Sequence, residues 1–205
     1  MISSFGKLLE LDRLLFEHVV IFERLPFIDN LMPWINCLAQ GGVIWLFIIL
    51  FFAAFHSLNG RKIFFLGSIS MLITFGFTWA LKLLVHRPRP FTMVTDILPP
   101  INLLSEKPLG FSFPSMQTSL AFAAIAILLA NTTNKFFKTF IYLMALLIGY
   151  SRIYEGVCYP LDVLGGAGLG LLCAKYVMNK MTRVNEKRCR IKYTIVAKRN
   201  IRRIK

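Results

Sequence analysis

The sequence predicts an all-α integral membrane protein, a helical bundle of about five transmembrane helices preceded by an amphipathic helix at the membrane interface. Hydrophobic residues make up 56% of the 205-residue chain, and Phe alone occurs 19 times. The mean hydropathy of +0.62 is too high for a soluble domain, whose core has no room for this much apolar surface. A lipid bilayer accommodates that surface, and the length suits one domain rather than two.

The N-terminal segment mixes apolar and charged side chains at helical spacing. Residues 5–24 combine Leu, Phe and Val with Lys, Glu, Asp and Arg, a pattern typical of a helix that lies in the interface rather than across the membrane. Because charges interrupt every apolar run, the segment lacks the core of a cleavable signal peptide. We therefore expect an interfacial helix over residues 1–24, ending before Pro26, and an interfacial position for residues 27–37.

Five apolar stretches define a transmembrane domain over residues 25–178. A span needs about 20 residues to cross the hydrocarbon core, so the third and fourth stretches are short, and we expect protein or water around their ends. The remaining residues, 179–205, form a basic tail. The expected spans are residues 38–56, 63–84, 115–131, 139–151 and 161–178.

Positive charge is concentrated at one end of this bundle. The turns at 57–62 and 132–138 and the tail together hold 15 of the 24 Lys and Arg residues and a single acid, Glu186. The positive-inside rule places this end and the C-terminus in the cytoplasm and the long 86–113 loop on the other side. We expect the tail to contact anionic lipid headgroups, because no groove-reading or base-stacking motif favours nucleic acid.

Three polar clusters lie at the non-cytoplasmic ends of spans, where helix packing would bring them into one pocket. They cover residues 82–90, 113–118 and 151–162. Lys82, Arg89 and Arg152 are costly at a membrane boundary unless an anion meets them, and their donors suit phosphate oxygens. Ser115 begins a span, where free backbone amides and the helix dipole favour an anion. A single basic residue at a helix end is more often one that reaches for lipid headgroups. Three of them, with a Pro-Ser helix start, favour a phosphate site.

The spacing of these residues resembles that of the type 2 phosphatidic acid phosphatases, which include bacterial undecaprenyl diphosphate phosphatases. The family motifs are Lys-x6-Arg-Pro, Pro-Ser-Gly-His and Ser-Arg-x5-His-x3-Asp. Three spaced motifs in order, over roughly residues 25–178, are far more specific than any one of them. In this chain the matching residues, in the same order, are Lys82, Arg89 and Pro90, then Pro114 and Ser115, then Ser151, Arg152 and Asp162.

The resemblance implies a metal-free and cofactor-free hydrolysis of a lipid phosphate or isoprenyl diphosphate at a bacterial inner membrane. In the family, the third-motif His attacks phosphorus, the Asp orients it, and the second-motif His protonates the leaving oxygen. The Lys and two Arg stabilise the phosphoryl charge. Carried over to this chain, these cations are Lys82, Arg89 and Arg152, and the orienting carboxylate is Asp162.

Both motif histidines are replaced in this chain. Cys158 occupies the nucleophile position and Gln117 the general acid position, and the preceding Gly is Met116. A carboxamide cannot give up a proton at neutral pH and regain it, so Gln117 can only hydrogen-bond. Loss of general acid catalysis typically costs about 10²–10⁴-fold in rate. The pattern therefore favours a catalytically degenerate family member that binds a lipid phosphate, with a membrane protein as a possible further partner.

Two other functions stay open. One is an active phosphatase in which the Cys158 thiolate attacks phosphorus, activated by Arg152, although the segment that follows the Cys, residues 159–166, contains no Arg to close a phosphate loop. His86 would then be a substitute acid, although an interfacial loop histidine is the simpler interpretation. The other is a lipid-phosphate carrier or scaffold. We expect Glu155 to be an exposed loop acid, with pairing to Arg152 as the alternative, and Asp162 to pair with Arg152 or to cap a helix.

Overall fold

The structure is a computed structural model that describes residues 4–22, 25–55, 60–92 and 107–204, the last 21 of these by their backbone alone. The described residues are helical with no strand, which confirms the predicted all-α class. The elements are α1 (Ser4–Phe22), α2 (Pro26–Ala39), η1 (Gln40–Gly42), α3 (Val43–Phe55), α4 (Gly60–Val85), η2 (Pro90–Thr92), α5 (Met116–Ala130), α6 (Lys135–Tyr154) and α7 (Pro160–Ile204).

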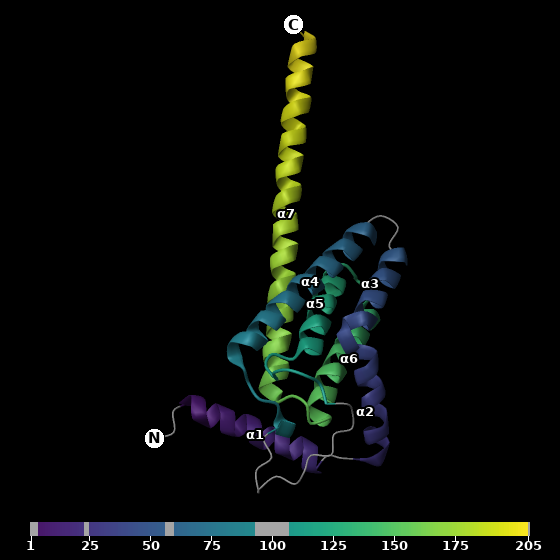
Figure 1. Ribbon diagram of the computed structural model, residues 1–205. Coiled ribbons are helices and arrows are strands. Elements are labelled where there is room, and N and C mark those ends of the chain that lie inside the picture. Colours follow the sequence, from purple (N-terminus) through teal and green to yellow (C-terminus); the bar gives the residue numbers. More distant parts are fainter. Residues whose placement is uncertain (1–3, 23–24, 56–59, 93–106, 205) are drawn as a thin grey trace.

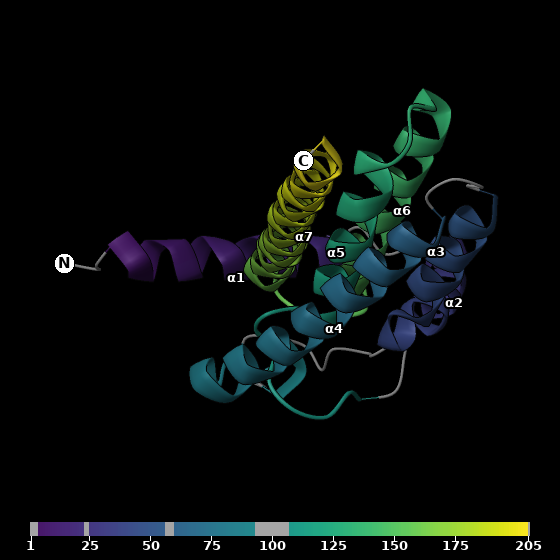
Figure 2. The ribbon, with the colours of Figure 1, turned by 90° about the horizontal axis from the view of Figure 1, so that it is seen from above.

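The helices form a bundle around α5, which contacts α3, α4, α6 and α7 (Figure 2). Helix α1 lies across one end of the bundle, and the far part of α7 extends beyond the opposite end (Figure 1). The start of α5, the α6–α7 turn and the end of α4 all lie at the end that α1 crosses, which we call the site end. The sequence-predicted clusters therefore share one end of the bundle.

The first span is longer than the sequence suggested. Residues 26–55 form one helical path of 30 residues, so the helix of the first span begins well before Leu38, whereas the interfacial position of residues 27–37 stays a prediction. Pro26 at the first helical position and Asp29 in the first turn favour a helix start there. The path bends at Gly41 and Gly42, whose φ angles of 63° and 73° favour glycine.

Four helical segments of the described chain are long and apolar enough to cross a membrane. Helix α5, with 15 residues, is shorter, and almost every side chain from Thr118 to Leu128 is buried. Protein therefore surrounds the middle of the short third span, whereas the prediction concerned its ends. The fourth span is not short, because α6 has 20 residues and includes the polar turn at Ser151 and Arg152. The tail continues α7 as one helix of 45 residues.

Helices α5 and α7 approach each other closely through glycine. A Cβ at Gly166 would lie 2.7 Å from the carbonyl oxygen of Ser115, and one at Gly170 only 2.2 Å from that of Ser119. A Cβ at Gly168, on the other face of α7, would meet nothing within 4 Å. The two glycines set the distance between α7 and the helix that begins at Ser115.

Helix α1 has one buried face and one exposed apolar face. Asp12, Phe16 and Val20, spaced four residues apart, are buried against the bundle. The leucines are between 39% and 57% exposed, at positions Leu8, Leu9, Leu11, Leu14 and Leu15. A helix that crosses the end of a bundle with leucines outward is suited to the membrane interface, and this location stays a prediction.

Candidate functional site

The site end brings together residues from all three clusters. Lys82 comes from the last turn of α4 and Arg152 from the last turn of α6, whereas Cys158 lies in the α6–α7 turn. Arg89 lies just before η2, and its guanidinium group lies within electrostatic range of the Cys158 side chain. Lys82 lies within electrostatic range of Cys158, Arg89 and Arg152. Three cations from separate parts of the chain thus lie within electrostatic range of one another, and two of them, Lys82 and Arg89, also of the Cys158 thiol.

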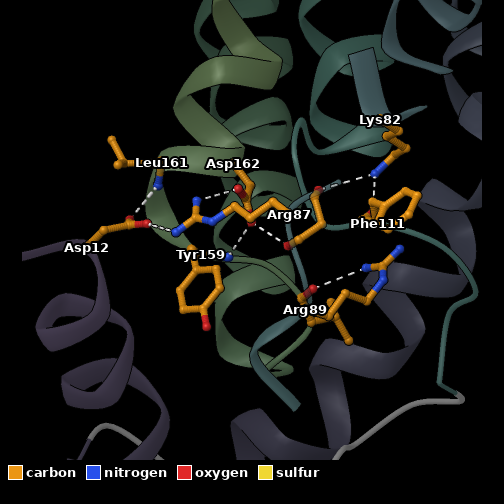
Figure 3. A network of polar contacts seen from close by, with 10 residues as sticks. Asp12, Lys82, Arg87, Arg89, Phe111, Tyr159, Leu161 and Asp162 are labelled. Carbon is orange, nitrogen blue, oxygen red and sulfur yellow. Dashed lines mark hydrogen bonds and ion pairs between the residues drawn. The ribbon is translucent and has the colours of Figure 1, made fainter. Parts of the chain in front are cut away.

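Lys82 and Arg89 hydrogen-bond to main-chain carbonyls of the loop before α5, and Arg89 also bonds to one in the α6–α7 turn. The ammonium of Lys82 donates to the oxygens of Phe111, at 2.7 Å, and Ser112, at 3.2 Å (Figure 3). Arg89 donates to the carbonyl oxygens of Leu109, Gly110 and Val157, at 2.8–3.2 Å. Arg89 is only 7% exposed. Within the described part of the chain, neither cation forms an ion pair with a carboxylate.

Asp162 is fully buried in the first turn of α7, and its carboxylate accepts three hydrogen bonds. The Oδ1 atom pairs with the Arg87 guanidinium at 2.6 Å, and Oδ2 accepts from the Tyr159 amide at 2.8 Å and from the Ser112 hydroxyl. The prediction that Asp162 pairs with Arg152 is therefore wrong. The alternative expectation was that Asp162 caps a helix. Its Oδ2 atom does accept from the Tyr159 amide in the turn that begins α7.

Sequence reasoning missed Arg87 and Asp12, which complete this network (Figure 3). Arg87 lies between two carboxylates, because its other nitrogen pairs with Asp12 Oδ2 at 2.5 Å. Asp12 Oδ1 accepts from the Leu161 amide at 2.7 Å, so a carboxylate of α1 caps the start of α7. Asp12 lies on the buried stripe of α1 with Phe16, and this helical spacing was the signal that could have found it.

Tyr159 supports Arg87 from the side. The guanidinium carbon lies 4.2 Å from the centre of the phenol ring, within the range of a cation–π contact. Phe16 of α1 packs against the same ring, with 5.2 Å between ring centres. Burial raises the pKa of the Tyr159 hydroxyl, and Arg87 partly offsets this. The phenol is therefore neutral over the physiological range and acts as an apolar platform for the cation.

Arg152 belongs to a second network, around Asn36 of α2. Its guanidinium donates to the Asn36 side-chain oxygen and, at 3.1 Å, to Glu155. Glu155 is completely buried, so the expectation of an exposed loop acid is wrong and the alternative pairing with Arg152 is confirmed. The Gln117 amide nitrogen donates to the same Asn36 oxygen at 2.9 Å. No pattern in the sequence indicated that Asn36 belongs to this network.

Ser115 and Cys158 are both closed off from solvent, with exposures of 1% and 3%. The Ser115 hydroxyl pairs with Thr118 at 2.9 Å, and its amide donates to the carbonyl oxygen of Asp162. Ser115 therefore ties the start of α5 to α7. His86, by contrast, is exposed and its ring contacts Phe111, as expected of a loop histidine.

A polar cavity of about 400 Å³ opens beside Arg152. Its lining comes from α2, η1, the loop before α5, the first turn of α5 and the last turn of α6. The lining residues are Pro33, Asn36, Cys37, Gln40, Lys107, Pro108, Gln117 and Arg152. Two motif positions, Gln117 and Arg152, thus line an open cavity, whereas Arg89, Ser115 and Cys158 are enclosed behind them.

Comparison with known proteins agrees with this geometry. Residues 63–186, more than half of the chain, match the PAP2 superfamily. The chain is 36% identical over 110 residues to the undecaprenyl-diphosphatase of Sulfolobus acidocaldarius, covering 54% of this chain and 51% of the relative. It is 29% identical over 122 residues to the lipid A 4'-phosphatase of Bacteroides thetaiotaomicron, covering 56% and 54%. The chain therefore spans about half the length of the curated relatives it matches.

The structural similarity extends further along the chain. The crystal structure of Aquifex aeolicus LpxE superimposes with a TM-score of 0.69 and 30% identity, covering 82% of this chain and 95% of that one. The match includes the helices that position all three clusters. The protein is an integral membrane protein with the fold of a membrane lipid phosphatase, and it belongs to the PAP2 superfamily, the type 2 phosphatidic acid phosphatases.

Proposed function

We propose that this chain binds the phosphate of a lipid phosphate or diphosphate at the site end and that it is a degenerate phosphatase, specialised for binding. The observation that carries the proposal is the pair Lys82 and Arg89, which have carbonyl oxygens but no carboxylate as partners among the described residues. Carbonyl dipoles position a cation without neutralising it, so the charge remains available to an anion. The lipid phosphatases among the relatives make a lipid headgroup the natural anion.

The local carboxylates do not compete for these two cations. Asp162 is engaged by Arg87, and Glu155 is engaged by Arg152. Lys82 and Arg89 are therefore the cations with positive charge to spare, next to Cys158. By the family resemblance, this is the place where the phosphoryl group would lie. Residues Lys82, Arg89, Ser115 and Arg152 are the proposed phosphate-binding set.

The geometry around the two replaced positions supports the loss of catalysis. Gln117 is held by Asn36 and has no titratable proton to deliver to a leaving oxygen. Asp162, which would orient a nucleophile, already accepts hydrogen bonds from Arg87, Ser112 and Tyr159. Cys158 thus has no base directed at it among these contacts.

We place the site on the extracytoplasmic side of a bacterial inner membrane, with the C-terminus in the cytoplasm. The support is the charge asymmetry: the end opposite the site holds most of the Lys and Arg residues, namely Arg61, Lys62 and those of the 132–138 turn and the tail. The same asymmetry supports contact between the basic tail and anionic lipids. Cysteine accessibility labelling of single-Cys variants in intact cells and in inverted vesicles would test this orientation.

The binding proposal is tested with purified protein in detergent and two probes, a short-chain phosphatidate and an isoprenyl diphosphate. Lys82→Met removes one charged donor to the phosphate and should weaken binding of both probes by about tenfold or more. Lys62→Met is the matched control, because Lys62 is an exposed lysine at the opposite end of the same helix. Equal affinities for the two variants, with unchanged melting temperatures, would refute the phosphate site.

The activity proposal is tested by phosphate release from the same lipids. We expect no turnover by the native protein and turnover by the double substitution Gln117→His with Cys158→His. A second candidate function, a Cys158-dependent phosphatase, is favoured by the proximity of Arg89, which donates to the carbonyl oxygen of the neighbouring Val157 and lies within electrostatic range of Cys158. Turnover by the native protein that disappears in Cys158→Ala would establish that candidate and refute degeneracy.

A further inference from the structure

The polar cavity beside Arg152 points to the kind of headgroup that the site accepts. Its charged lining consists of Lys107 and Arg152, and its uncharged polar lining consists of three carboxamides, Asn36, Gln40 and Gln117. None of the described lining residues is an acid. Cations favour an anionic ligand, whereas carboxamides are suited to groups that both donate and accept hydrogen bonds.

Arg152 connects this cavity with the enclosed cation cluster. It lines the cavity, and it also lies within electrostatic range of Lys82. A phosphate held by Arg152 and the cluster would therefore leave the rest of its headgroup in the cavity, against the carboxamides. At about 400 Å³ the cavity has room for several non-hydrogen atoms beyond the phosphate.

The orientation of Gln117 follows from the donors around it. Arginine has only donors, so Asn36 presents its oxygen to Arg152. Gln117 meets that same oxygen and must present its nitrogen, at 2.9 Å. The Gln117 Oε1 atom is left buried with no partner among the described groups. An unpartnered buried acceptor is unfavourable, and the proposal requires the Gln117 carboxamide to rotate so that this oxygen reaches the cavity that Gln117 lines.

The chemical group that would donate a hydrogen bond to the Gln117 oxygen is identified by excluding the groups that do not suit the cavity. A phosphate ionised beside cations offers only acceptors, so it cannot satisfy the Gln117 oxygen. An ammonium headgroup has donors but would be repelled by Lys107 and Arg152. A hydroxyl group is a neutral donor and also accepts from the neighbouring carboxamides.

We propose that the cavity is a recognition subsite for a hydroxyl-bearing headgroup, so that the ligand is a polyol or sugar phosphate lipid rather than an isoprenyl diphosphate. Gln117, at the position of the family's general acid, contributes an acceptor for a headgroup hydroxyl instead of a proton. This inference rests on the proposed phosphate binding, because the phosphate is what places the headgroup beside Arg152.

The test uses two short-chain lipids of equal charge whose terminal phosphate is joined through a three-carbon linker. One linker bears a hydroxyl, and in the other that hydroxyl is replaced by hydrogen. The purified protein in detergent should bind the hydroxylated lipid about three- to tenfold more tightly, the range expected for one neutral hydrogen bond. Gln117→Met, which removes the acceptor at similar volume, should reduce this ratio to one while both lipids still bind.

Asn131→Leu is the matched control, because Asn131 is a carboxamide at the opposite end of α5 that bonds to the Ile127 carbonyl. It should keep the affinity ratio of the native protein. Equal affinity of the native protein for the two lipids would overturn the hydroxyl subsite and leave the phosphate site intact. Failure to bind either lipid would overturn both proposals. Glycerol 3-phosphate, a soluble anion with the same chemistry, should bind at least tenfold more weakly than the hydroxylated lipid, and equal binding would overturn the assignment to a lipid headgroup.

Discussion

Replacing Asp12 by Asn should weaken the attachment of α1 to the site end. The carboxylate is 2% exposed and accepts from Arg87 at 2.5 Å and from the Leu161 amide at 2.7 Å. An asparagine of the same shape keeps one oxygen but turns an NH₂ group toward one of these two donors. At least one charge-assisted hydrogen bond is lost, which costs about 1.5–3 kcal/mol of unfolding free energy. Arg87 stays neutralised by Asp162, so the full cost of an isolated buried charge is not incurred.

The assay is thermal unfolding of the purified protein in detergent. For a chain of this size, 1.5–3 kcal/mol corresponds to a decrease in melting temperature of about 3–12 °C. Glu17→Gln is the control on the same helix, because Glu17 pairs with Arg13 in an exposed i,i+4 bridge whose side chains are 24% and 45% exposed. Such a pair contributes only about 0.3–0.5 kcal/mol. If Asp12→Asn and Glu17→Gln lowered the melting temperature equally, the reasoning about the α1 network would be refuted.

Two further predictions concern α7 and its first turn. Gly170→Ala should lower the yield and melting temperature of the folded protein, because its Cβ would lie 2.2 Å from the Ser119 carbonyl oxygen, whereas Gly168→Ala should be neutral or slightly stabilising. Similar melting temperatures for the two variants would contradict the close packing. Burial raises the pKa of Tyr159, so its neutral phenol favours the folded state, and this contribution is lost as pH rises through the raised value. Absorbance titration at alkaline pH should show that Tyr159→Phe removes an ionisation above pH 10, and removal of an ionisation below that value would contradict the assigned burial.

The transmembrane layout could be predicted because it depends on local signals. Apolar runs located α3, α4, α5 and α7, and motif spacing selected Lys82, Arg89, Ser115 and Arg152 as residues of one end. The helix of the first span was predicted to begin too late, because Pro33 and Trp34 are residue types typical of an interface. In the structure, α2 continues through that proline and bends only later, at the two glycines.

The polar pairings of the site could not be predicted, because partners far apart in the chain leave no periodic signal. Arg87 is an unspecified position within the first motif, and only the fold shows that it neutralises Asp162. Glu155 resembled an exposed loop acid, because nothing local shows that the α6–α7 turn is buried. Asn36 contacts Arg152 across 116 positions of sequence, a distance at which pattern analysis gives no information.

The position of Asp12 also imposes an order on assembly. Its two partners, Arg87 and Leu161, follow it by 75 and 149 positions, and the second belongs to the last helix of the bundle. During synthesis from the N-terminus, α1 is made first and yet has no complete docking site until the first turn of α7 has formed. Loop closure over that length is entropically costly and is repaid only when the intervening helices have packed. Helix α1, although made before α7, is thus completely docked only after α7 has begun to form, so its attachment reports that the helices between them have been assembled.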